Sequence, residues 1–109
     1  MSVIYPRPLR PGDRIVVIDP ANAFTEDGIR GMREYLEGKG FEVAFSKDMA
    51  FRRGTPRERA EIMNEAVRDE RNKGIFCMWG GYGSMTLLDH LDYQALEKNR
   101  PVFSGFSDI

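Results

Sequence analysis

The sequence has little cysteine, no excess of charge of either sign and no long apolar run. Its single cysteine, Cys77, excludes an internal disulfide, and its place in an apolar stretch predicts a buried, unreactive thiol in a reducing compartment. Sixteen basic residues are balanced by seventeen acidic ones, and the two signs are interspersed along the chain. A nucleic-acid partner is therefore not expected.

The first residues also lack the pattern of a targeting segment. Residues 1–14 hold three prolines and three arginines without an apolar core, which is not the pattern of a secretory signal. No stretch approaches the roughly 20 apolar residues of a membrane span. We therefore expect a cytoplasmic protein without a membrane partner, and its 109 residues, 41% of them hydrophobic, fit one globular domain.

What the chain does contain is an alternation of apolar strands and amphipathic helices. The predicted strands are 14–18, 41–45, 74–78 and 101–105, and the predicted helices begin after Thr25 and after Thr55 and span 84–91 and 93–98. Both threonines are typical helix caps, and the second precedes Pro56 and Glu58 in the arrangement of a capping box.

Alternating strands and helices predict βαβ crossovers and a parallel sheet with helices on both faces. The expected fold class is α/β, a three-layer parallel sheet of the flavodoxin-like or class I glutamine amidotransferase-like type. Ligands of such folds bind beyond the carboxyl ends of the strands. Three loops occupy that place here, at 19–24, 79–84 and 106–109.

The run Gly80-Gly81-Tyr82-Gly83-Ser84 places a hydroxyl on a glycine-rich turn between an apolar strand and a helix. At such a corner the first N–H groups of the helix lack partners and can bind an anion, so Ser84 is a candidate nucleophile. Alternatively, Ser84 serves only as the cap of the following helix, a role that serine often fills. The pattern lacks the second glycine of a G-x-S-x-G elbow and the lysine of a phosphate-binding loop. Leu87, Leu88 and Leu91 are expected on the inner face of the helix.

An ordered set of motifs resembles one known family. The set comprises Arg7-Pro8-Leu9-Arg10-Pro11-Gly12-Asp13-Arg14-Ile15, Gly40-Phe41-Glu42-Val43, Gly80-Gly81-Tyr82-Gly83-Ser84, Leu91-Asp92-Tyr93 and Gly105-Phe106-Ser107-Asp108-Ile109. Together these motifs look like the amino-terminal domain of the LD-carboxypeptidase family of serine peptidases. The similarity extends from about residue 6 to the last residue.

The resemblance implies that residues 1–109 form the nucleophile-bearing domain of a longer enzyme, whose absent carboxyl-terminal domain supplies the Glu and His of a Ser-His-Glu triad. Members of the family release terminal D-alanine from murein tetrapeptides in cell-wall recycling, by acyl-enzyme chemistry without metal or cofactor. A homodimer is expected. By position Ser84 is the nucleophile, and the backbone amides of Gly81 and Met85 form the oxyanion hole.

Three further residues are expected to contact the substrate. Tyr82 lies among the glycines of the turn, and Asp108 belongs to a Ser-Asp pair that matches the family. Asp19 ends the first strand, where family members commonly carry a small hydroxyl residue, so the details of the substrate stay open. Each aspartate also fits a cap of its following turn.

The only histidine, His90, is not expected to serve as the base. On a continuous α-helix it lies about 9 Å along the axis from Ser84 and about 240° around it. A serine without a base is a weak nucleophile, so the isolated domain is expected to be nearly inactive.

Two alternative functions stay open. The first is the antibiotic-immunity branch of the family, which cleaves microcin C-type peptide-nucleotide conjugates. Asparagine often stands there at the position of Gly83, so the sequence favours the cell-wall substrate. The second is a non-catalytic fragment that self-associates through an open sheet edge.

Overall fold

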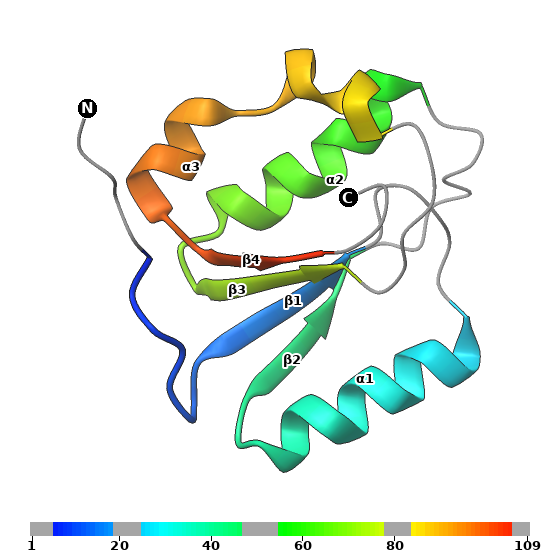
Figure 1. Cartoon of the computed structure of the whole chain (residues 1–109), viewed down its shortest axis with the longest axis vertical. Helices are drawn as coiled ribbons and strands as arrows, with labels where there is room; N and C mark the ends of the chain where they lie inside the picture. Colours follow the sequence, from blue (N-terminus) through cyan, green and yellow to red (C-terminus); the bar gives the residue numbers. More distant parts are fainter. Residues whose placement is uncertain (1–5, 19–24, 47–54, 78–83, 106–109) are drawn as a thin grey trace.

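The computed structural model describes residues 6–18, 25–46, 55–77 and 84–105 (Figure 1). Its strands are β1 (Arg14–Ile18), β2 (Glu42–Phe45), β3 (Asn72–Cys77) and β4 (Val102–Ser104). Its helices are α1 (Glu26–Gly38), α2 (Pro56–Arg68) and α3 (Tyr93–Asn99), with a 3₁₀ helix, η2 (Ser84–His90), before α3. The predicted strands and helices are thus confirmed, with ends that differ by one or two residues.

The four strands form one parallel sheet in the order β2-β1-β3-β4. This is the order of the first four strands in flavodoxin-like sheets. Strand β1 lies inside the sheet between β2 and β3, and four of its five residues are buried. The prediction that the β-branched run at 14–18 is a central strand is therefore confirmed, since both faces of an inner parallel strand are covered.

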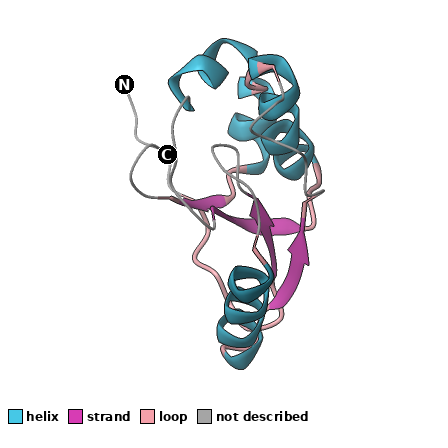
Figure 2. Ribbon diagram, turned by 90° about the vertical axis from the view of Figure 1, so that its right-hand side faces the viewer, coloured by secondary structure: helices cyan, strands magenta, loops and turns pink. Residues whose placement is uncertain are grey.

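Helices cover both faces of the sheet, so that the fold has three layers (Figure 2). On one face α2 packs against the sheet through a cluster that comprises Val16, Ile18, Ile62, Ala66, Val67, Ile75 and Cys77. On the other face α1 contributes Leu36, which packs with Ile15 and Val17. Alternate residues of β1 thus enter opposite cores, and complete burial of each such side chain contributes about 1.5–3 kcal/mol.

The two predicted threonine caps are confirmed. Thr25 Oγ1 accepts a hydrogen bond from the Gly28 N–H at 3.0 Å, and Thr55 Oγ1 accepts one from the Glu58 N–H at 3.1 Å. These bonds give partners to N–H groups that have none inside the helix.

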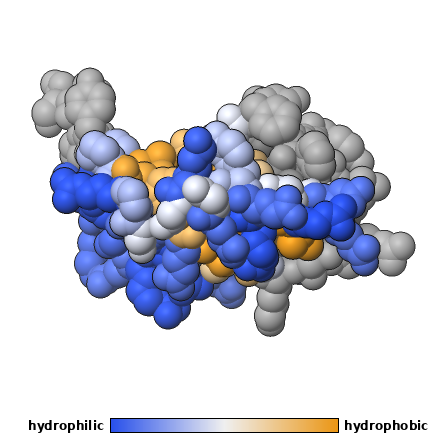
Figure 3. Space-filling model, turned by 90° about the horizontal axis from the view of Figure 1, so that it is seen from below, coloured by the Kyte–Doolittle hydropathy of each residue, from blue (hydrophilic) through white to orange (hydrophobic). Residues whose placement is uncertain are grey.

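The outer face of α1 is charged. The surface of the molecule seen from below the view of Figure 1 is mainly hydrophilic, with only small apolar patches (Figure 3).

The turn between α2 and β3 contains a carboxylate with an unusually low pKa. Arg71 donates from its guanidinium to both carboxylate oxygens of Asp69, at 3.0 and 2.7 Å. These side-chain hydrogen bonds, with a further one from the Arg71 N–H, lower the pKa of Asp69 from 3.8 to about 2. Since the pKa is lower in the folded chain, the pair stabilises the fold fully above about pH 4, and this stabilisation disappears as the pH falls through about 2.

We expect Asp69→Asn to lower the free energy of unfolding at pH 7 by about 1 kcal/mol or less, because Arg71 is largely exposed. At pH 2 the variant and the parent chain should differ little. Urea titrations at the two pH values measure this difference. Glu70→Gln is the control, since the contact of Glu70 with Lys98 joins two exposed side chains. A loss for Asp69→Asn that is equally large at both pH values would contradict the assignment.

Candidate active site

The carboxyl ends of three neighbouring strands lie together at one edge of the sheet. Ile18, the last residue of β1, is the register partner of Cys77, the last residue of β3. Ser104 at the end of β4 is likewise the partner of Phe76. The chain therefore leaves β1, β3 and β4 side by side, at the edge where parallel α/β sheets bind their ligands.

Ser84 is the first residue of η2, and Met85 is the second. The prediction that this serine begins a helix is thus confirmed. The first N–H groups of a helix have no partner within the helix, as the predicted role of the Met85 N–H requires. Four other predicted site residues, Asp19, Gly81, Tyr82 and Asp108, lie outside the described residues, and their roles stay predictions.

The helix that follows Ser84 differs from the expected one. It is a 3₁₀ helix rather than an α-helix, and it ends at His90. Leu87 is buried at 3% exposure, but Leu88 is 51% exposed, so the expectation that Leu88 faces the core was wrong. Adjacent side chains of a 3₁₀ helix point about 120° apart, compared with about 100° in an α-helix, so two neighbouring leucines fit less easily on one face.

The tighter helix also changes the relation between Ser84 and His90. The expected angle of about 240° belongs to an α-helix of 3.6 residues per turn, whereas six residues of a 3₁₀ helix make two full turns. The expected angle was therefore wrong. The rise of about 2.0 Å per residue nevertheless places them about 12 Å apart along the axis, far beyond the roughly 3 Å of a catalytic hydrogen bond. His90 remains unsuited to activate Ser84.

A buried asparagine of α2 holds the end of η2. Asn64 is only 4% exposed, and its Nδ2 donates to the His90 carbonyl at 2.8 Å. Its Oδ1 accepts from the Asp92 N–H, also at 2.8 Å. Asn64 was not among the residues predicted to act at the site. The available signal was a polar residue on the apolar face of α2, four positions after Ala60 and three before Val67.

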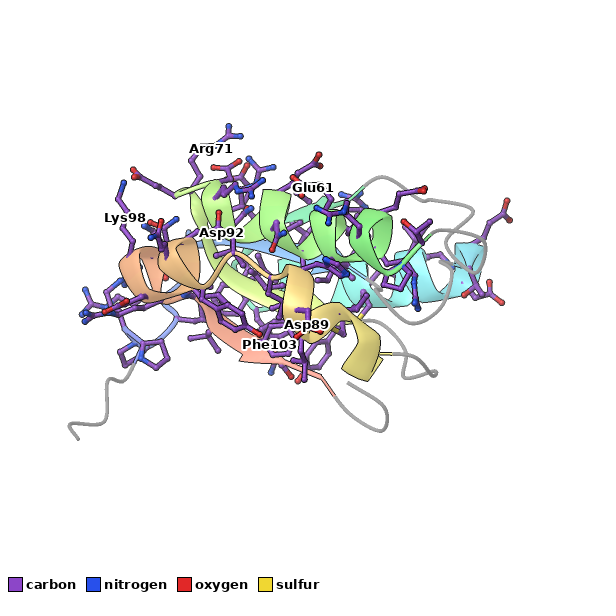
Figure 4. The ribbon with its side chains drawn as sticks, turned by 90° about the horizontal axis from the view of Figure 1, so that it is seen from above. Glu61, Arg71, Asp89, Asp92, Lys98 and Phe103 are labelled. Atoms are coloured by element: carbon purple, nitrogen blue, oxygen red, sulfur yellow. The ribbon has the colours of Figure 1, made fainter. Side chains whose placement is uncertain are left out.

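An ion-paired group next to Asn64 fixes the start of α3. Asp92 Oδ1 accepts from the Ala95 N–H at 3.0 Å, while its Oδ2 accepts from Arg68 Nε at 2.7 Å. The backbone hydrogen bond from Ala95, followed by that from Arg68, lowers the pKa of Asp92. Arg68 also contacts Glu61, and these two acidic partners raise the pKa of Arg68. Figure 4 shows Asp92 where the chain turns from η2 into α3, alongside α2.

A cavity of about 360 Å³ lies at the opposite edge of the sheet, and it is lined by Pro6, Arg7, Lys73, Asn99 and Arg100. Its cationic groups already have partners. Arg7 forms two hydrogen bonds with Asp13, and Lys73 donates to a backbone carbonyl. Because Lys73 is near the amino end of β3, this cavity is not at the ligand-binding edge, and we do not assign the candidate site to it.

The part of the chain that the structure describes contains no group of three or more His, Cys, Asp or Glu side chains that could hold a metal ion. Among the same residues, no helix has the length and apolar character needed to cross a membrane.

Comparisons with known proteins identify the family of this chain. The family model for the LD-carboxypeptidase N-terminal domain matches residues 15–109. A Vibrio cholerae protein named for a carboxypeptidase activity is 33% identical over 98% of this chain and 34% of its own length. The murein tetrapeptide carboxypeptidase of Pseudomonas aeruginosa is 31% identical over 88% of this chain and 33% of its own length.

Solved structures give the same result. The MccF-like protein of Bacillus anthracis superposes with a TM-score of 0.87 at 33% identity, over 98% of this chain and 35% of that protein. The muramoyltetrapeptide carboxypeptidase of Oxalobacter formigenes superposes with a TM-score of 0.71 at 26% identity, over 87% of this chain and 33% of that protein. The present chain spans about a third of the length of each of these relatives. The chain belongs to the LD-carboxypeptidase family, in which it corresponds to the N-terminal domain.

Proposed function

We propose that this chain carries the nucleophile of a serine-type LD-carboxypeptidase that releases D-alanine from murein tetrapeptides. In this proposal the whole protein comprises residues 1–109 and a further part that corresponds to the remaining two-thirds of the length of its relatives. The observation that supports the proposal most strongly is the place of Ser84 in the fold, at the start of the helix that follows strand β3 of a parallel sheet. The named activity of the Pseudomonas aeruginosa relative supports the substrate.

The proposed chemistry divides between the two parts of the whole protein. Ser84 Oγ attacks the carbonyl carbon of the L,D-amide bond and gives its proton to a histidine outside this chain, which a glutamate orients. The N–H groups of Gly81 and Met85 stabilise the oxyanion, and the D-alanine amine leaves with the proton. Water then hydrolyses the acyl-enzyme. Tyr82, Asp19 and Asp108 are proposed to contact the peptide.

The setting of the enzyme is part of the same proposal. We place it in the cytoplasm, in cell-wall recycling, as a homodimer that uses neither metal nor cofactor. A fold like that of class I glutamine amidotransferases is consistent with the strand order of the four described strands. Residues 1–109 alone should be nearly inactive, because His90 is too far from Ser84 and a serine without a base reacts slowly.

A second candidate function rests on the solved structures. The microcin C7 self-immunity protein MccF, in a complex with aspartyl sulfamoyl adenosine, superposes on this chain with a TM-score of 0.83. A related hydrolase of peptide-nucleotide conjugates therefore has structural support. The glycine at position 83 favours the murein substrate over this alternative.

The two candidates differ in the substrate that the whole protein cleaves faster. We expect kcat/KM for D-alanine release from a murein tetrapeptide to exceed that for hydrolysis of aspartyl sulfamoyl adenosine by at least about 100-fold, since a site shaped for one leaves polar groups of the other unpaired. Competition between the substrates, followed by chromatography of both products, measures this ratio. Faster cleavage of the nucleotide would favour the immunity function, and cleavage of neither would contradict both.

A further inference from the structure

The segment that begins with Ser84 has little internal support. Hydrogen bonds of a 3₁₀ helix have poorer geometry than those of an α-helix, and runs beyond three or four residues are uncommon. Helix η2 is seven residues long. Its position must therefore depend on contacts with neighbouring elements. Leu87 supplies one such contact in the middle of the helix, because its side chain is buried.

Asn64 supplies the contact at the end of η2. Its one amide group binds two backbone atoms on either side of Leu91, the His90 carbonyl and the Asp92 N–H, each at 2.8 Å. These partners lie 26 and 28 residues further along the chain. Because the amide nitrogen donates to one and the amide oxygen accepts from the other, a flipped amide would place donor against donor and acceptor against acceptor. The side chain therefore fixes both the place and the orientation of this corner.

A second polar contact between α2 and this corner is weaker. Arg68 pairs with Asp92, but the side chain of Arg68 is 49% exposed, and pairs of this kind add little stability. The hydrogen bonds of Asn64 are formed by a residue that is 4% exposed. Removal of its amide would leave two part-buried backbone groups without this partner, which is more costly than loss of an exposed pair.

We propose that Asn64 is a positioning residue, which holds η2 so that Ser84 is correctly placed for attack. The inference rests on the proposed function, in which Ser84 is the nucleophile. Because η2 has little internal support, loss of its anchor at His90 would let the whole segment, Ser84 included, leave its place. Misplacement of a reacting group by about 1 Å can cost about 10²-fold in rate. The amide of Asn64 thus acts on kcat through the position of the serine, without contact with the substrate.

The test compares Asn64→Leu with Asn99→Leu in the whole protein. Asn99 is a matched control, because its Nδ2 also bridges α2 and α3, with a 2.7 Å hydrogen bond to the Val67 carbonyl. It lies at the far end of α3 from η2. Two rates are measured for each variant: D-alanine release from a murein tetrapeptide, and labelling of the serine by a fluorophosphonate.

We expect Asn64→Leu to lower kcat and the labelling rate by about 10- to 100-fold, with KM changed by less than about threefold. Asn99→Leu should keep both rates within about twofold of the parent protein. Circular dichroism reports whether each variant is folded. If Asn64→Leu does not fold, Asn64→Asp decides the question. It retains the acceptor for the Asp92 N–H, removes the donor to the His90 carbonyl, and should also lower the labelling rate.

The outcomes separate the inference from the function on which it rests. Labelling of Ser84 at the same rate in the parent and in a folded Asn64 variant would overturn the inference alone. An equal loss of rate in Asn99→Leu would also overturn it, because general loosening of α3 would then explain the effect. If the parent protein is not labelled at Ser84 at all, the proposed function fails, and the inference fails with it.

Discussion

Replacement of Ser84 by alanine in the whole protein is expected to lower kcat for D-alanine release by on the order of 10⁴-fold or more. The variant lacks the atom that forms the acyl-enzyme, so only the oxyanion donors and substrate binding can still assist the reaction. KM should change little, because the serine hydroxyl contributes mainly to the transition state. A coupled assay for free D-alanine measures both parameters.

Ser104→Ala is the control for this substitution. Ser104 also ends a segment at the carboxyl edge of the sheet, but on β4 rather than at the start of a helix. This variant should keep kcat within about twofold of the parent protein, since surface substitutions without special contacts usually have small effects. Undiminished D-alanine release by Ser84→Ala would contradict the nucleophile assignment.

The second large effect is expected for the two adjacent leucines of η2. Leu87→Ala should lower the free energy of unfolding of the 109-residue chain by about 2–4 kcal/mol, because it leaves a cavity beside the buried core. Leu88→Ala, with the same chemical change at an exposed position, should lower it by less than about 1 kcal/mol. Urea denaturation followed by circular dichroism measures both values.

These two substitutions test directly which of the two leucines of η2 faces the core. The α-helical pattern expected from the sequence places both leucines on the inner face and predicts two comparable losses. The structure, in which Leu87 is buried and Leu88 is exposed, predicts one large loss and one small loss. Equal destabilisation by the two substitutions would therefore contradict the described structure of this segment.

The elements of the fold were predictable because each depends on local chemistry. The β-branched run at 14–18 has no polar residue after its first, which is typical of a strand covered on both faces. Thr25 and Thr55 have oxygen atoms that can accept from the third residue of their helices, and both do so. Parallel pairing then follows from the alternation of strands and helices.

The details around the candidate site were less predictable. Residues 84–90 contain only three apolar side chains, too few for a hydrophobic pattern to separate periods of 3.0 and 3.6, so η2 was expected to be α-helical and Leu88 to be buried. The hydrogen-bond partners of Asn64 could not be inferred either, since they are backbone atoms 26 and 28 residues away. Such contacts depend on how the helices pack rather than on local sequence.

The central claim is that Ser84 is the nucleophile, and the site of covalent labelling tests it most directly. The whole protein is treated with a fluorophosphonate until D-alanine release stops, then digested with trypsin and analysed by mass spectrometry. We predict a single adduct on the peptide of residues 74–98, in which Ser84 is the only serine. An adduct on a serine outside this peptide, formed in step with the loss of activity, would contradict the claim.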